Sequence, residues 1–183
     1  GDALSARPWL RIYYAWACFF TASEAAEAQL KAVEQHPGAP AEMQGHIAAI
    51  RAWIAYMRGD SDRAAVFSRQ ALEVCPQMDA AVRSGLAAIW GDGCLAQTDL
   101  AGSARAFAEA LDLARSSGNI MLEVLSRTSL GALNQAMGRL REAEAIFREA
   151  LQTAIRSKSP AAGQAYACLA HVYREWNDLA SAR

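Results

Sequence analysis

The feature that most constrains this chain is a repeat of about 39 residues. When the Ala-Leu pairs of the sequence are aligned, one turn position recurs at intervals of 38 to 40 residues, at Thr21, Gly59, Thr98, Gly138 and Asn177. A near-constant period of this size is typical of solenoids, in which each unit buries its apolar face only against its neighbours. The repeat therefore has to be interpreted before any local motif.

Each repeat has the pattern of a helix, a tight turn and a second helix. Seven residues before the turn the residue is small in four of the five repeats, as at Gly91 and Gly131, and Tyr14 is the exception. Nine residues beyond the turn stand large apolar side chains such as Phe107 and Phe147. This spacing indicates pairs of helices in close contact. We expect helices near 8–20, 23–35, 41–58, 61–75, 79–97, 100–116, 119–137, 140–157 and 160–176, with a last one starting near 179.

The predicted fold is all-α, a right-handed superhelical solenoid of about four and a half helix pairs. The composition agrees, because the chain is 53% hydrophobic, rich in alanine and leucine, and contains only 5 prolines. We expect one domain over 1–183, with units near 7–38, 41–77, 79–117, 119–158 and 160–183. Because the sequence stops in the first turns of a helix, at "LASAR", we also expect it to be a fragment of a longer protein.

Charge and composition exclude several classes of function. The net charge is −1, with acids and bases interleaved, so this fragment is not expected to bind nucleic acid directly. No stretch approaches the roughly 18 apolar residues of a membrane span, and no secretion signal opens the chain. We therefore expect a cytoplasmic protein with no membrane partner.

No catalytic or metal site is predicted. The 4 cysteines are single and far apart, and the 3 histidines lie in separate repeats, so neither a metal cluster nor a nucleophile-base pair is indicated. The "GDG" at 91–93 lacks the alternating acids of a calcium loop and the lysine of a phosphate loop. The sequence predicts no enzyme, and no cofactor in this fragment.

The stretch "GRLREAEAIFREAL" at 138–151 resembles the second-helix signature of the tetratricopeptide repeat (TPR), although the period here is longer than its usual length of about 34. Together with "SARPWLRIYYAWACFF" and "HIAAIRAWIAYMRGDSDRAAVFSRQAL", it is similar to the sensor region of MalT-like, LuxR-family transcriptional activators. The resemblance implies a parent protein with a nucleotide-binding domain, with ATP as its nucleotide, before this region and a DNA-binding helix-turn-helix after it. It also implies that the superhelix receives a small-molecule inducer, a sugar in the best-known member, or a regulatory protein.

In the TPR pattern the first helix of each pair lines the concave wall of the superhelix. Trp53 and Tyr56 on this wall could stack on a sugar ring or an aromatic ligand, and Asp92, Gln135 and His171 could offer hydrogen bonds. The alternative is that Trp53 and Tyr56 only pack between adjacent first helices. The full set of candidate ligand-binding residues is Arg11, His46, Trp53, Tyr56, Asp92, Thr128, Gln135, Gln164, His171 and Arg174.

Two functions follow as hypotheses. The first is the signal-receiving domain of a MalT-like LuxR-family regulator, which would bind an effector and act on the other domains of its parent chain. The second is a TPR scaffold that mediates protein–protein interaction without a small-molecule effector. A deep aromatic and polar pocket would favour the first, and a long shallow groove the second.

Overall fold

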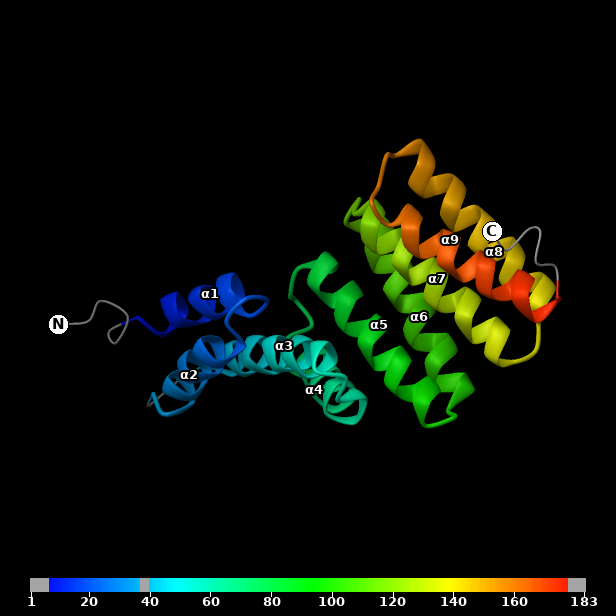
Figure 1. Ribbon diagram of the computed structural model, residues 1–183. Coiled ribbons are helices and arrows are strands. Elements are labelled where there is room, and N and C mark those ends of the chain that lie inside the picture. The colour runs from blue at the N-terminus through cyan, green and yellow to red at the C-terminus, as the bar shows by residue number, and fades with distance from the viewer. Residues whose placement is uncertain (1–6, 37–39, 178–183) are drawn as a thin grey trace. The chain divides into compact units, whose positions relative to one another are not determined.

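The computed structural model describes residues 7–36 and 40–177, and within them all regular secondary structure is helical (Figure 1). The nine described helices are α1 (Pro8–Cys18), α2 (Ser23–Glu34), α3 (Ala41–Met57), α4 (Ser61–Val74), α5 (Ala80–Ala96), α6 (Leu100–Ser116), α7 (Ile120–Ala136), α8 (Leu140–Arg156) and α9 (Ala162–Glu175). Each predicted helix agrees with these bounds to within two residues. The helix expected near 179 lies outside the described residues.

The helices form two compact units, Gly1–Met78 with α1 to α4 and Asp79–Arg183 with α5 to α9. In the first unit α1 pairs with α2 and α3 with α4, while α1 also packs on α3. In the second unit the pairs are α5 with α6 and α7 with α8, and α9 packs on both α7 and α8. This arrangement confirms an all-α fold built from TPR-like helix pairs. The right-handed superhelix and the division into repeat units stay predictions.

The recurring turn is a left-handed helix cap. Gly59 and Gly138 have φ of +74°, and Thr98 and Asn177 have φ of +61° and +59°. At the first three of these turns the next amide donates to a carbonyl five residues back, as from Asp60 to Ala55 over 3.0 Å. Such a cap satisfies carbonyls that the end of a helix leaves free. The sequence alignment therefore located the turn at the correct residue in four of the five repeats.

The first repeat is the exception. Thr21 is not among the described residues with positive φ, and the amide of Ala22 instead donates to the carbonyl of Cys18 over 2.7 Å. The prediction of the same turn at Thr21 is therefore wrong. Thr98 adopts the left-handed region at the equivalent turn, so the residue type does not explain the difference; α1 is instead capped at Phe19 in a right-handed conformation.

The small and aromatic positions of the repeat interlock inside the second unit. A Cβ atom on Gly91 would lie 2.5 Å from the ring of Phe107, and one on Gly131 would overlap the ring of Phe147. Both phenylalanines are fully buried. The glycine on the first helix thus provides the space that the ring of the second helix fills, which explains the predicted close contact.

Helix starts in the middle of the chain are set by side-chain caps. The carboxylates of Asp60, Asp79 and Asp99 accept hydrogen bonds from the first amides of α4, α5 and α6, and the Asn119 amide oxygen does the same for α7. These bonds satisfy amides that a helix leaves free at its start. Among the described residues, no helix is both long and apolar enough to cross a membrane.

Candidate functional site

The first unit carries a continuous row of aromatic rings along α1 and α3. The contacts run from Trp9 to His46, from His46 to Trp16 and from Trp16 to Phe19, with ring centroids 5.5, 6.3 and 5.6 Å apart. They continue from Phe19 to Trp53 and from Trp53 to Tyr56, at 6.4 and 6.3 Å. We call this set the aromatic row; its members are Trp9, Trp16, Phe19, His46, Trp53 and Tyr56.

The rings of the aromatic row range from buried to exposed. Phe19 is buried, whereas Trp9, Trp16 and Trp53 pack on the core of the unit with part of their surface still accessible. Tyr56 at the end of the row is 45% exposed. Trp53 therefore has one contact with the neighbouring first pair, through Phe19, and remains partly open to a ligand. The packing interpretation therefore describes part of the environment of Trp53, and ligand binding at its open face stays a prediction.

His46 is held at the centre of the row. Its Nδ1 accepts a hydrogen bond from the indole Nε1 of Trp16 over 3.2 Å, so the neutral ring carries its proton on Nε2. Burial lowers the pKa of His46, and the nearby carboxylate of Glu42 opposes this shift only in part. The ring is therefore neutral at pH 7 and acts as an acceptor within the row.

Glu42, His46 and Cys75 come together at the start of α3 and the end of α4. One ligand atom from each lies within 4.8 Å of the other two, a convergence that the sequence analysis missed. Burial, with a smaller effect of Glu42, raises the pKa of the Cys75 thiol, so it stays protonated at neutral pH. A metal ion bound to Cys75 would have to displace the proton of its thiol. A metal ion bound to Nδ1 of His46 would also have to replace the hydrogen bond from the indole of Trp16.

In the second unit the structure brings together three of the predicted residues, Gln135 on α7 with His171 and Arg174 on α9. The amide nitrogen of Gln135 lies 3.0 Å from Nδ1 of His171, and Arg174 lies 2.7 Å from its Nε2. Glu175, which the sequence analysis missed, accepts from Gln135 over 2.6 Å. All of these contacts are exposed, so they form a polar surface cluster rather than an enclosed pocket.

The other predicted residues are dispersed. Thr128 is buried, and its hydroxyl donates to the carbonyl of Leu125 over 2.7 Å within its own helix, so it does not face a ligand. Gln164 is exposed and contacts Cys168, and Arg11 donates to Gln29 on α2 over 2.7 Å. Asp92 lies half-buried on α5.

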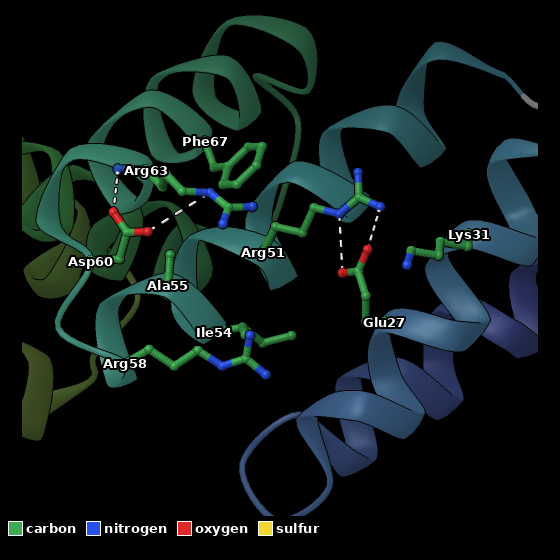
Figure 2. Close-up of a pocket in the computed structure, with 9 residues that line it drawn as sticks. All are labelled: Glu27, Lys31, Arg51, Ile54, Ala55, Arg58, Asp60, Arg63 and Phe67. Carbon is green, nitrogen blue, oxygen red and sulfur yellow. Dashed lines mark hydrogen bonds and ion pairs between the residues drawn. The ribbon is translucent and has the colours of Figure 1, made fainter.

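A pocket of about 510 Å³ lies in the first unit, between α2, α3 and α4 (Figure 2). None of the predicted site residues lines it. We call it the polar pocket; its lining residues are Glu27, Lys31, Arg51, Ile54, Ala55, Arg58, Asp60, Arg63 and Phe67. A volume of this size lies within the range of small-molecule sites.

Arg51 joins the two helices that flank the polar pocket. From α3 it donates to both carboxylate oxygens of Glu27, over 3.2 and 2.7 Å, and to both of Glu34, over 2.7 and 2.9 Å. The hydrogen bonds lower the pKa of Glu34 and raise that of Arg51. This double fork–fork pairing fixes α2 against α3. Two glutamates seven residues apart on one predicted helix face, Glu27 and Glu34, were the available signal in the sequence.

The remaining cations around the pocket are held differently. Arg58 donates to the hydroxyl of Ser23 over 3.0 Å. Arg63 lies over the ring of Phe67 at 5.8 Å and is 3.8 Å from a carboxylate oxygen of Asp60. Neither Lys31 nor Arg58 forms an ion pair with a carboxylate of the described residues. In Figure 2 both side chains point toward the space between α2 and α3.

Comparison with protein families gives one match, to a family described as the MalT-like TPR region, over residues 45–183. The chain belongs to the MalT-like TPR family. The match covers α3 from Gly45 onward and all of α4 to α9. A comparison with curated proteins finds no relative.

Several solved structures share the fold of this MalT-like TPR region. The apo form of RapI has a TM-score of 0.77 at 12% identity, over 96% of this chain and 66% of that one. A Rap protein complexed with Competence and Sporulation Factor has a TM-score of 0.74 at 17% identity, over 100% and 52%. Aspartyl phosphate phosphatase F from Bacillus subtilis has a TM-score of 0.77 at 13% identity, over 99% and 50%.

These identities establish a common fold and nothing more. The MalT-like TPR region spans about half to two thirds of the length of these three structures. The Rap complex and the phosphatase activity belong to those proteins. What this region binds has to be argued from its own residues.

Proposed function

We propose that this MalT-like TPR region is the signal-receiving part of a cytoplasmic LuxR-family transcriptional regulator, and that it receives its signal at the aromatic row. The proposal is supported by the family match and by one structural observation, the partly open rings of Trp53 and Tyr56 on α3. Aromatic faces bind sugar rings and other flat apolar surfaces, and the neutral His46 and the indole groups add polar atoms beside them.

The mechanism we propose is a population shift. An effector that contacts α1 and α3 together would favour one arrangement of these two helices and so alter how the ATP-binding domain of the parent protein is restrained. A ligand shifts such an equilibrium only by its difference in affinity between the two states. Addition of the effector to the full-length parent should therefore change its ATP affinity or its self-association.

The test is a thermal-shift screen of this chain against sugars, oligosaccharides and common metabolites. A ligand at one hundred times its dissociation constant should add about 2.7 kcal/mol, a shift of about 5–10 °C for a chain of this size. Trp53→Ala should abolish the shift. Trp176→Ala, which removes a partly exposed tryptophan of the second unit, is the matched control and should retain it. Equal shifts in both variants would contradict a site at the aromatic row.

A second candidate function is a scaffold that binds a regulatory protein without a small-molecule effector. The observation in its favour is that Tyr13 and Phe20, which contact members of the aromatic row, are 61% and 68% exposed. Large exposed rings of this kind mark protein interfaces. A screen in which no compound shifts the melting temperature, together with binding of a purified regulatory protein that Phe20→Ala weakens, would favour this function.

A further inference from the structure

We propose that the polar pocket of the first unit binds a small organic anion, with its charged group between Lys31 and Arg58 and its apolar part against Phe67 and Ile54. This inference goes beyond the proposed function. The polar pocket and the aromatic row share no residue, so either site can be present without the other.

The charge around the pocket favours an anion. Four cations line it, Lys31, Arg51, Arg58 and Arg63, against two carboxylates, Glu27 and Asp60. Arg51 is already bound by Glu27 and Glu34, and Arg63 is neighboured by Asp60. Lys31 and Arg58 are left without an ion pair among the described residues, on opposite sides of the same space (Figure 2). The charge of Lys31 also acts on Glu34 of its own helix, and Arg58 donates to Ser23. Two cations that border one space in this way provide a site for a carboxylate or a phosphate.

The pocket also has an apolar wall. Ile54 and Ala55 of α3 are 6% and 7% exposed, so the atoms they present belong to a packed surface. Phe67 of α4 lies beneath the guanidinium of Arg63 at 5.8 Å. Small-molecule sites combine apolar lining with a few polar or charged groups, and the polar pocket has both kinds of residue.

The site is held in shape before any ligand arrives. Arg51 fixes α2, which carries Lys31, against α3, whose C-terminal cap is Arg58. Asp60 both caps the start of α4 and contacts Arg63. Because these contacts already order the surrounding side chains, binding costs less conformational entropy than it would on a flexible surface.

The excess of positive charge argues against a metal cation as the ligand. A nucleic acid would require an extended basic face, whereas the whole chain has a net charge of −1. The volume of about 510 Å³ fits a ligand of metabolite size. A compact anion therefore matches both the charge and the size of the pocket.

The test is isothermal titration calorimetry of the full chain with glucose 6-phosphate, succinate and glucose, each up to about 10 mM and at constant ionic strength. Glucose 6-phosphate and succinate distinguish a phosphate ligand from a carboxylate ligand, and glucose reports binding that needs no charge. The variant is Lys31→Gln with Arg58→Gln. The matched control is Arg105→Gln with Lys158→Gln, which removes two exposed charges from the second unit.

We expect at least one of the two anions to bind and glucose to bind more weakly. The double variant in the pocket should raise the dissociation constant at least about tenfold, because the loss of one hydrogen bond to a charged group already weakens binding by about this factor. The control variant should change the dissociation constant less than about twofold. Far-ultraviolet circular dichroism should show that both variants are folded, because all four side chains are exposed.

Three outcomes would overturn the proposal. The first is the absence of binding by either anion, and the second is an equal loss of affinity in both double variants. The third is binding of an acidic peptide such as hexaglutamate when neither small anion binds, which would make the pocket part of a protein interface. A failed screen at the aromatic row with intact anion binding would contradict the proposed function and leave this inference in place.

Discussion

The two units of the molecule join successive helix pairs by different means. In the first unit one apolar core joins α1, α2 and α3, but α2 touches α3 only sparsely, and Arg51 adds a charged bridge between these two helices through Glu27 and Glu34. In the second unit α6 packs along much of α7, and a fully apolar cluster joins α7, α8 and the start of α9. Ion pairs in the second unit link helices of the same pair, as from Arg83 to Glu109, and also link α6 to α7, from Arg115 to Glu123 over 3.6 Å.

This difference explains where the candidate sites lie. Small apolar side chains such as Ala150 and Ala154 allow neighbouring helices to close on each other and leave no space between them. At the sparse junction of α2 with α3, Arg51 and Glu27 line the polar pocket. The polar pocket and the aromatic row both lie in the first unit, so we expect a ligand to bind there.

The largest expected loss of stability comes from removing a buried aromatic ring from the second unit. Phe147→Ala removes a fully buried ring that fills the space beside Gly131 and should cost about 3–5 kcal/mol. Phe67→Ala in the first unit removes a partly exposed ring and should cost about 1 kcal/mol. Urea denaturation gives the free energy of unfolding of both variants. Equal losses would contradict the expectation that Phe147 contributes more to stability than Phe67.

The next effect is on the charged junction. Arg51→Met should cost about 1.5–3 kcal/mol, because it breaks the pairing with both glutamates and leaves them partly buried. Arg83→Met removes a single 3.3 Å contact and an Nε atom that has no partner among the described residues, so it should cost less than about 1 kcal/mol. If Arg83→Met proved the more costly change, the charged junction would not be what holds α2 to α3.

Two buried serines test how completely the second unit is packed. The Ser84 hydroxyl donates to the carbonyl of Ala110 over 2.8 Å, so Ser84→Ala should cost about 1 kcal/mol. The hydroxyl of Ser103 is buried with no partner among the described residues, so Ser103→Ala should be neutral or stabilising by up to about 1 kcal/mol. Guanidinium denaturation of the two variants should give opposite or clearly unequal shifts, and a substantial loss for Ser103→Ala would indicate a hydrogen bond that the structure does not show.

The smallest effect concerns pH and the aromatic row. Burial lowers the pKa of His46, so the unfolded chain binds this proton more tightly than the folded chain. The contribution of neutral His46 is therefore fully present above about pH 6.5 and is lost as the pH falls through the folded pKa. Between pH 7.5 and 5.5 the urea midpoint should fall more for the native chain than for His46→Gln. The same slope in both would contradict a buried, neutral His46; Glu34, whose pKa is lowered, titrates below this window.

The repeating part of the fold could be predicted from the sequence because the repeat encodes it locally. The period located the helices, and the alignment identified recurring small and large positions. The structure shows that they form the contacts of Gly91 with Phe107 and Gly131 with Phe147. Among the five aligned turns, the left-handed cap is absent only at Thr21, where α1 is capped at Phe19 in a right-handed conformation; Thr98 adopts the left-handed backbone at the same repeat position, so the residue type does not explain this difference. A position that recurs in every repeat can be predicted by comparing the repeats with one another. The first repeat is the hardest to predict because it differs from the others at Tyr14 and at Thr21.

The sites were less predictable, because they depend on residues that do not repeat. Position counting selected Trp53 and Tyr56 correctly as neighbours on α3 but also selected Thr128, which is buried. It could not identify the polar pocket, whose residues come from two helix pairs and are related by the pairing of Arg51 with α2. Whether a side chain pairs inside the fold or faces a ligand is set by such contacts, and helical periodicity does not report them.

The most direct test of the central claim, that the first unit receives the signal, is hydrogen exchange followed by mass spectrometry. The chain would be measured with and without an effector found in the screen. We predict slower exchange in α1 and α3 around the aromatic row, with α5 to α9 unchanged. Protection confined to α7 and α9, around Gln135 and His171, would contradict the account and place the site in the second unit.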